Sequence, residues 1–105
     1  MIKTGGENVS SQEVENILYK QGKLMQVAVL GLPDPIWGEA VTAAVVPLPG
    51  ATVTDEEIIA YCKASMAGYK VPKKVVRVPS MPATPSGKIL KRLLKDQIWK
   101  DLGLK

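Results

Sequence analysis

One lysine stands where a positive charge could act on an anion. Lys88 ends the loop 82–88 and directly follows Gly87, whose backbone freedom would let the lysine side chain swing. A mobile ammonium suits a developing phosphoryl or carboxylate anion, and losing a preorganised contact of this kind typically costs about 2.7–4 kcal/mol in the transition state. Lysines near a helix start are usually solvated, so the residues alone leave a catalytic and a solvated role for Lys88 open.

Two glycines near the N-terminus and one aromatic residue are the next candidates for ligand contacts. Gly5 and Gly6 offer exposed backbone and room for a thin ligand to pass, although such a pair is also typical of a tight turn before a helix. Trp37 lies in a loop between two apolar segments, where its ring would either plug the end of the sheet or present a stacking face. Both alternatives remain open at each position.

Residues 69–74 combine an aromatic ring with three positive charges. Tyr69 and the lysines that follow it, Lys73 among them, could hold an adenine and its phosphates. A solvated basic turn is the simpler alternative for the same residues. The segment is therefore a candidate nucleotide contact.

Length and composition limit the kinds of chemistry available. A chain of 105 residues fits one domain but is too small to enclose two large substrates, so any reaction must take place at its surface. The single cysteine, Cys62, and the absence of histidine exclude an internal disulfide, a side-chain zinc site and a Cys/His nucleophile pair. We therefore predict no metal site. No apolar run approaches the roughly 18 residues that cross a bilayer, and no signal peptide is evident, so a cytoplasmic location is expected.

The charge balance indicates an anionic partner. Fourteen Lys and Arg residues against ten Asp and Glu give a net charge of +4, and the excess lies mostly between residues 63 and 95. Nucleic acid, an anionic membrane surface and a phosphorylated cofactor all remain possible partners. Aromatic residues make up only 5% of the chain and phenylalanine is absent, which argues against a platform that stacks nucleic-acid bases.

Capping signals locate the first two helices. Ser10 with Glu13 forms a capping-box pattern that predicts a helix up to about residue 20. Thr54 with Glu57 predicts a second helix, which Gly68 would end.

Strands are predicted from apolar runs bounded by prolines and glycines. Residues 24–32 are almost continuously apolar, as expected of a strand covered on both faces, and residues 40–46 follow as a second strand. Residues 74–78 predict a short third strand, whereas residues 3–8 predict a turn or loop beside short extended pieces.

The last helix is expected to begin at Lys88 and to be amphipathic. Its apolar face would carry Leu90, Leu93, Leu94 and Ile98, and its solvent face Lys91, Arg92, Lys95 and Lys100. Together these elements predict a small compact domain of the α+β class, with a three-stranded sheet flanked by helices.

Three ordered motifs carry a resemblance that covers essentially the whole chain. They read IKTGGENVSSQEVE over residues 2–15, GLPDPIWGEAV over residues 31–41 and PATPSGK over residues 82–88. In this order and at these separations they resemble the C-terminal domain of the adenylate-forming enzymes, which include acyl-CoA synthetases, luciferases and peptide-synthetase adenylation domains.

The resemblance implies a function for the whole of residues 1–105 as one small, mobile lid domain. In such enzymes a large N-terminal domain, absent from this chain, binds ATP with Mg and the acyl group. Carboxylic acid, ATP and CoA become acyl-CoA, AMP and pyrophosphate through an acyl-adenylate. The resemblance assigns Lys88 as the catalytic lysine of adenylation, and we expect the isolated chain to be inactive.

The same resemblance implies a second set of site residues. After adenylation the lid would rotate, withdraw Lys88 and bring the glycine loop to the active site. Gly5, Gly6 and Glu7 would line the channel for the pantetheine arm of CoA, and Lys3 matches a position that assists the second step in luciferases. Trp37, Tyr69 and Lys73 would lie near the CoA nucleotide. Val71 departs from relatives that carry a basic residue there for the CoA phosphate, so either Lys70 or Lys73 replaces that contact or the contact is absent.

Other functions remain open at this point. The chain could belong to an enzyme that loads a carrier protein, in which case free CoA would not saturate the reaction. It could also be a non-catalytic module that binds an anion or a nucleotide, or a structural interaction domain in which loss of Lys88 has no effect. The motif match favours the ligase lid, with its own N-terminal domain, a carboxylic acid, ATP and CoA as partners, and with neither a nucleic-acid partner nor a membrane span.

Overall fold

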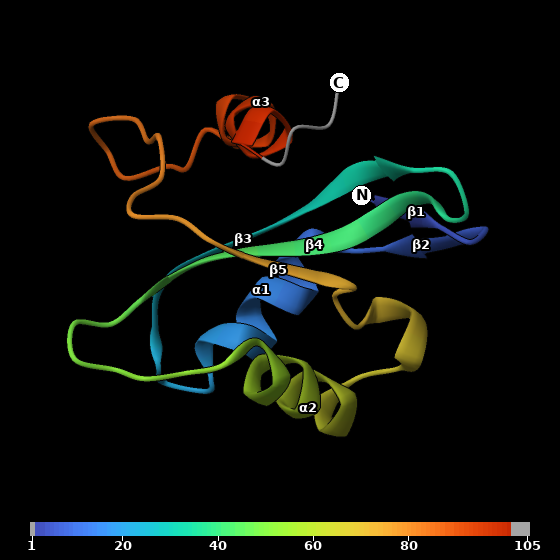
Figure 1. Ribbon diagram of the computed structural model, residues 1–105, viewed down its shortest axis with the longest axis horizontal. Coiled ribbons are helices and arrows are strands. Elements are labelled where there is room, and N and C mark those ends of the chain that lie inside the picture. Colours follow the sequence, from blue (N-terminus) through green and yellow to red (C-terminus); the bar gives the residue numbers. More distant parts are fainter. Residues whose placement is uncertain (1, 102–105) are drawn as a thin grey trace.

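Two apolar segments pair into a long hairpin at the centre of the computed structural model, which describes residues 2–101. Strands β3 (Leu24–Asp34) and β4 (Gly38–Pro47) are antiparallel, with Val29 opposite Ala43. Their β-branched and small residues suit a pleated surface that is covered on both sides. In Figure 1 this hairpin runs through the middle of the molecule, with helices on both sides of it.

Three shorter strands extend the sheet beyond the other edge of β4. β5 (Lys74–Arg77) runs parallel to β4, and β1 (Ile2–Thr4) pairs antiparallel with β4 only where Thr4 meets Gly38. β2 (Glu7–Val9) then pairs with β1 across the glycine turn, so the sheet has five strands. The α+β class and three of the strands agree with the sequence prediction, but the predicted strand number was too low. Three-residue strands are too short to show an alternating pattern.

Helices cover both faces of the sheet (Figure 1). α1 (Ser11–Tyr19) and α2 (Asp55–Ser65) lie on one face, and α3 (Lys91–Asp101) lies on the other. Alternate residues of the central hairpin serve the two faces. Those that pack with α1 and α2 are Val27, Val29, Val41, Ala43 and Val45, and those that pack with α3 are Ala28, Leu30, Leu32, Ala44 and Val46.

Both predicted N-caps are present. The Ser10 hydroxyl accepts a hydrogen bond from the Glu13 amide at 3.3 Å, and Thr54 and Glu57 form the complete reciprocal capping box. α2 ends at Ser65, earlier than predicted, and Gly68 instead begins the short 3-10 helix η1 (Gly68–Lys70). The N-terminal ends of both helices are therefore fixed by local sequence.

Cys62 belongs to the core between α2 and the sheet. Burial raises the pKa of its thiol to about 11. The thiol is therefore protonated at neutral pH and unsuited to nucleophilic chemistry.

The start and the buried face of α3 differ from the prediction. The helix begins at Lys91, so Lys88 lies in the preceding loop and does not start the helix. Leu94 and Ile98 are buried against the sheet, but Leu93 is 54% exposed and does not belong to the core. The helix is thus about one turn shorter at its N-terminus than predicted. Leu93 is exposed because it lies one residue away from the buried stripe of Leu94 and Ile98.

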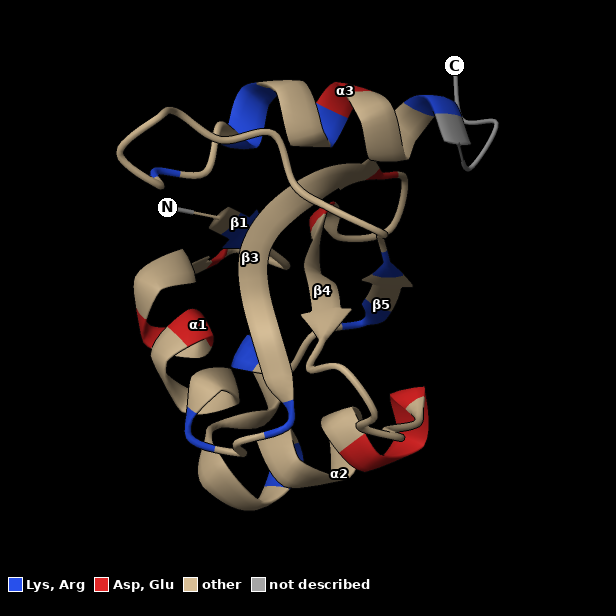
Figure 2. Ribbon diagram, turned by 90° about the vertical axis from the view of Figure 1, so that its left-hand side faces the viewer, with Lys and Arg blue, Asp and Glu red and all other residues tan. Residues whose placement is uncertain are grey.

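Charges are distributed unevenly over the helices (Figure 2). Asp55, Glu56 and Glu57 occupy the first turn of α2, where the helix dipole favours negative charge. α3 has no acidic residue in its first turn and begins with Lys91. Among residues 2–101, no helix is long and apolar enough to cross a membrane.

Replacing Leu94 with alanine should destabilise the domain, because Leu94 is fully buried between α3 and the sheet. The expected loss is about 2–5 kcal/mol in the free energy of unfolding. Urea denaturation followed by circular dichroism measures it. Leu93→Ala is the matched control on the neighbouring, exposed position and should change stability by less than about 0.5 kcal/mol. Equal losses for the two variants would contradict the described packing of α3.

Candidate functional site

Lys88 lies at the end of a small hairpin that precedes α3. Ala83 forms an isolated bridge with Ile89, and the Leu90 amide donates to the Pro82 carbonyl at 2.8 Å. The Thr84 amide donates to the Lys88 carbonyl at 2.8 Å, and the Lys88 amide donates to the Thr84 hydroxyl at 3.1 Å. The backbone of Lys88 is therefore fixed in both directions, although the residue is exposed.

The hairpin turn depends on Gly87. Its φ of +92° lies in a region that residues with a side chain rarely adopt, and its amide donates to the Thr84 carbonyl at 2.8 Å. The Thr84 hydroxyl also lies 2.9 Å from the Ser86 hydroxyl. These contacts close the turn immediately before Lys88.

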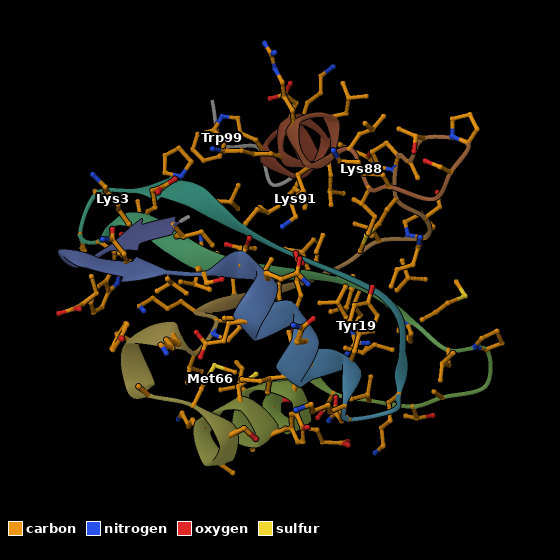
Figure 3. The ribbon with its side chains drawn as sticks, turned by 180° about the vertical axis from the view of Figure 1, so that it is seen from behind. Lys3, Tyr19, Met66, Lys88, Lys91 and Trp99 are labelled. Carbon is orange, nitrogen blue, oxygen red and sulfur yellow. The ribbon has the colours of Figure 1, made fainter. Side chains whose placement is uncertain are left out.

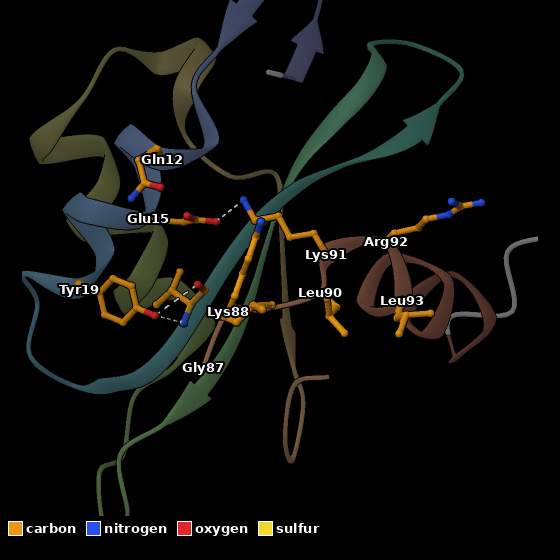
Figure 4. Close-up of a pocket in the computed structure, with 11 residues that line it drawn as sticks. Gln12, Glu15, Tyr19, Gly87, Lys88, Leu90, Lys91, Arg92 and Leu93 are labelled. Atoms are coloured by element: carbon orange, nitrogen blue, oxygen red, sulfur yellow. Dashed lines mark hydrogen bonds and ion pairs between the residues drawn. The ribbon is translucent and has the colours of Figure 1, made fainter. Parts of the chain in front are cut away.

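The Lys88 side chain lines an open groove of about 720 Å³ between α1 and the start of α3. In Figure 4 it points toward the side of α1 that carries Glu15. Glu15 itself pairs with Lys91, with 2.6 Å between the carboxylate and the ammonium. Among the residues that the structure describes, no carboxylate forms an ion pair with Lys88. The Lys88 ammonium is therefore available to an anion from outside the domain.

The glycine turn packs against Trp37 at another part of the molecule. The Gly5 amide donates to the Trp37 carbonyl at 2.9 Å, and a Cβ on Gly5 would lie only 3.0 Å from the Trp37 ring. Gly5 and Gly6 have φ values of +56° and +84°, which place β1 and β2 side by side. Gly6 has open space where a side chain would be, and Glu7 next to it is exposed. The turn therefore presents bare backbone at the surface.

Trp37, Tyr69 and Lys73 meet at a second groove, of about 560 Å³, which Lys63 also lines. The Lys73 ammonium lies 4.2 Å from the centre of the Trp37 ring, within the range of a cation–π contact. Trp37 and Tyr69 are each about two-fifths exposed, at 41% and 39%. The groove thus combines aromatic faces with positive charge.

The lysines around this groove differ in their availability. Lys70 pairs with Glu13 at 2.9 Å, and the hydrogen bond to that carboxylate raises the pKa of the Lys70 ammonium. Val71 is buried in the core beside the same segment. Of the two lysines that could replace a basic residue at Val71, only Lys73 lines the groove.

Asp34 fixes the loop that carries Trp37. Its carboxylate accepts hydrogen bonds from the amides of Ile36, at 2.8 Å, and Trp37, at 3.0 Å. The bond from Trp37, followed by the bond from Ile36, lowers the pKa of the Asp34 carboxyl, because both stabilise its charged form. Asp34 is thus a support for Trp37.

Lys3 lies on β1, next to the glycine turn and far from Lys88. Its amide donates to the Glu39 carboxylate at 2.9 Å, and its side chain is exposed. Figure 3 shows Lys3 and Lys88 apart from each other, Lys3 at one edge of the domain and Lys88 in the hairpin before α3. The predicted site residues therefore form two separate groups, one around Lys88 and one around the glycine turn and Trp37.

Comparison with known proteins identifies the family. The model for the C-terminal domain of AMP-binding enzymes matches residues 13–88. The chain belongs to this family. A feruloyl-CoA synthase from Amycolatopsis sp is 48% identical over 91 residues, which cover 87% of this chain and 18% of that protein.

Solved structures of the family agree with the fold. A fatty acyl CoA synthetase of Mycobacterium tuberculosis matches 92% of this chain at 43% identity with a TM-score of 0.87, over 19% of its own length. ATP-bound MatB from Rhodopseudomonas palustris matches 98% of this chain at 34% identity with a TM-score of 0.88, over 20% of its length. The chain thus spans about a fifth of these relatives and corresponds to their C-terminal domain.

Sequence reasoning about this C-terminal domain missed the ion pair at the start of α3, three residues after Lys88. Lys91 was predicted to face solvent, but it pairs with the buried Glu15 and donates to the Val29 carbonyl at 3.2 Å. Ser11, Glu15 and Tyr19 recur at every fourth position of α1, and this polar stripe was the available signal. No group of three potential metal ligands occurs among residues 2–101.

Protonation of Asp34 should release the Trp37 loop. It should occur at a lower pH than the protonation of an ordinary aspartate. The pKa of Asp34 is depressed in the folded domain, so its stabilising contribution is present above the usual value of about 3.9 and is lost as pH falls through the lower folded value. NMR titration of the Ile36 and Trp37 amide resonances measures the midpoint. Asp34→Asn should remove the titration, and a midpoint at or above the usual aspartate value would contradict the two hydrogen bonds.

Proposed function

We propose that this domain is the mobile lid of an AMP-forming carboxylate–CoA ligase, which converts a carboxylic acid, ATP and CoA into acyl-CoA, AMP and pyrophosphate. Its family membership and its similarity to a feruloyl-CoA synthase and a fatty acyl CoA synthetase support the proposal. The observation that carries it is the separation of the Lys88 group from the glycine-turn group (Figure 3). Two separate groups suit two half-reactions.

In the first half-reaction Lys88 meets the carboxylate and the α-phosphate of ATP. The hairpin fixes its backbone, and its ammonium has no carboxylate partner among the described residues, so little has to be broken before it meets an anion. Its role is to orient the two anions and to offset the charge that develops between them. ATP with Mg is held mainly by the N-terminal domain of the complete ligase, and the isolated chain does not turn over.

In the second half-reaction the glycine-turn group meets CoA. The bare backbone at Gly5 and Gly6, with Glu7 beside it, lines the path of the pantetheine arm. Trp37 and Tyr69 offer aromatic faces for adenine. Lys73, which lines the same groove, offers charge for phosphate. Lys3, on the strand before the turn, approaches the reacting centre in this orientation and assists the second step.

A rotation of the domain connects the two steps. The groups around Lys88 and around Gly5 lie on different parts of one folded unit, so a single orientation of the domain would not present both to one active site. Turning the domain withdraws one group and presents the other. The domain therefore acts as a two-sided lid on its own N-terminal domain.

Lys88→Ala, made in the complete ligase that contains this domain, should lower acyl-adenylate formation by about a hundredfold or more. Pyrophosphate release from ATP and the acid measures this step. Thioester formation from preformed acyl-adenylate and CoA should be almost unchanged, because Lys88 is then turned away.

Lys95→Ala on α3 is the matched control, because Lys95 belongs to neither group of site residues. It should leave both half-reactions unchanged. A Lys88→Ala enzyme with normal adenylation would exclude the catalytic role and would leave a cover or an anion-binding module as the function of the domain.

Trp37→Ala should raise the KM for CoA in the second half-reaction while adenylation stays normal. Stacking of a base on an aromatic ring contributes about 1–3 kcal/mol, so the expected increase is roughly tenfold or more. Steady-state kinetics with preformed acyl-adenylate measures it. Ile36→Ala, at a neighbouring residue that is 82% exposed, is the control and should have little effect. A parent enzyme that free CoA cannot saturate would instead support the loading of a carrier protein.

A further inference from the structure

A buried carboxylate joins three elements at the open edge of the sheet. Glu15 of α1 is only 7% exposed. One of its oxygens accepts a hydrogen bond from the Val29 amide of β3 at 2.8 Å and lies 2.6 Å from the ammonium of Lys91, the first residue of α3. α1, β3 and α3 therefore meet at one carboxylate.

Lys91 reaches this carboxylate around the edge of β3. It donates to the Val29 carbonyl and to the Ser11 hydroxyl, both at 3.2 Å, in addition to its pairing with Glu15. β3 ends the strand order, so the outward amide and carbonyl of Val29 have no neighbouring strand to bond. Glu15 and Lys91 satisfy these two groups together.

The place of Lys91 in its own helix is unfavourable. A positive charge at a helix N-terminus opposes the helix dipole, and the first turn of α3 has no acidic residue to offset it. Local sequence preference therefore does not explain a lysine at this position. Its contacts with Glu15, Val29 and Ser11 explain why a lysine stands there.

Lys91 is also the anchor nearest to Lys88 along the chain. The strand of the hairpin that contains Lys88 and Ile89 runs through Leu90 directly into Lys91, and Ile89 and Leu90 are each held to the opposite strand of the hairpin. Glu15, Lys88 and Lys91 line the same groove (Figure 4). A shift of Lys91 would therefore move the base of the hairpin relative to α1.

We propose that Glu15 and Lys91 are positioning residues for adenylation, because their ion pair fixes the base of the Lys88 hairpin relative to α1. The inference rests on the proposed role of Lys88. Because Lys91 already pairs with the buried carboxylate of Glu15, that carboxylate does not bind Lys88, which remains free for its substrate. A pair that only stabilises the fold would affect both half-reactions alike, whereas a positioning pair affects adenylation alone.

The test uses Lys91→Met in the complete ligase, with the two half-reactions assayed separately. Adenylation should fall about 10- to 100-fold in kcat with little change in the KM for ATP, because a misplacement of about 1 Å can cost 100-fold. Thioester formation from preformed acyl-adenylate should stay normal, which also shows that the variant is folded. Lys91→Arg, which keeps the charge, should restore most of the adenylation rate, and Lys95→Met on the same helix is the matched control.

A double variant distinguishes positioning from an independent effect. If Lys91 acts through Lys88, adding Lys91→Met to Lys88→Ala should lower adenylation no further than Lys88→Ala alone. Multiplying effects, equal loss of both half-reactions, or no effect of Lys91→Met would each overturn the inference. Lys88→Ala is measured in parallel: if it alone leaves adenylation normal, the proposed function fails, and if it is impaired while Lys91→Met is normal, only the positioning role fails.

Discussion

The pairing of β3 with β4 determines where both groups of site residues lie. The two strands stay in register from Leu24 opposite Pro47 to Asp34 opposite Gly38, with one irregularity near Leu24. Their connecting loop presents Trp37 at one end, and the outward edge of β3 offers Val29 to α1 and α3. Because both faces of this hairpin are covered, a shift of one residue would turn core side chains to the wrong face. Positions of site residues that lie far apart in the sequence are thus fixed by one register.

Each group of site residues also has its own polar support. Asp34 holds the amides of the Trp37 loop, and the Gly5 amide bonds to the Trp37 carbonyl, so the glycine turn and the ring are placed together. Glu15 and Lys91 play the corresponding part for the Lys88 hairpin. In both places a carboxylate binds backbone or ammonium donors, which are among the stronger hydrogen bonds in proteins. The sites can therefore be exposed and still be well positioned.

The sequence predicted those parts of the fold that depend on local signals. Ser10 and Thr54 begin their helices as predicted, and the continuous apolar run of residues 24–32 is a strand covered on both faces. The ion pair of Lys91 with the buried Glu15 could not be predicted, because Glu15 lies 76 positions away and on the far side of an edge strand. Glu15 and Lys91 look like ordinary helix-surface residues until the sheet brings them together. The role of Lys88 stays a prediction from the family resemblance, whereas the contacts that hold its backbone are visible only in the three-dimensional structure.

The positive charge of the chain acquires a more definite meaning in three dimensions. Between residues 63 and 95, ion pairs engage Lys70, Arg77 and Lys91 with carboxylates of α1 and α2. The remaining basic residues in this stretch are Lys63, Lys73, Lys74, Lys88, Arg92 and Lys95. Lys63 and Lys73 line the Trp37 groove, and Lys88 and Arg92 line the groove beside α1. A surface that binds a long polyanion would need its unpaired cations along one continuous path. Cations that gather beside two separate grooves instead suit the two small anionic groups of the proposed half-reactions.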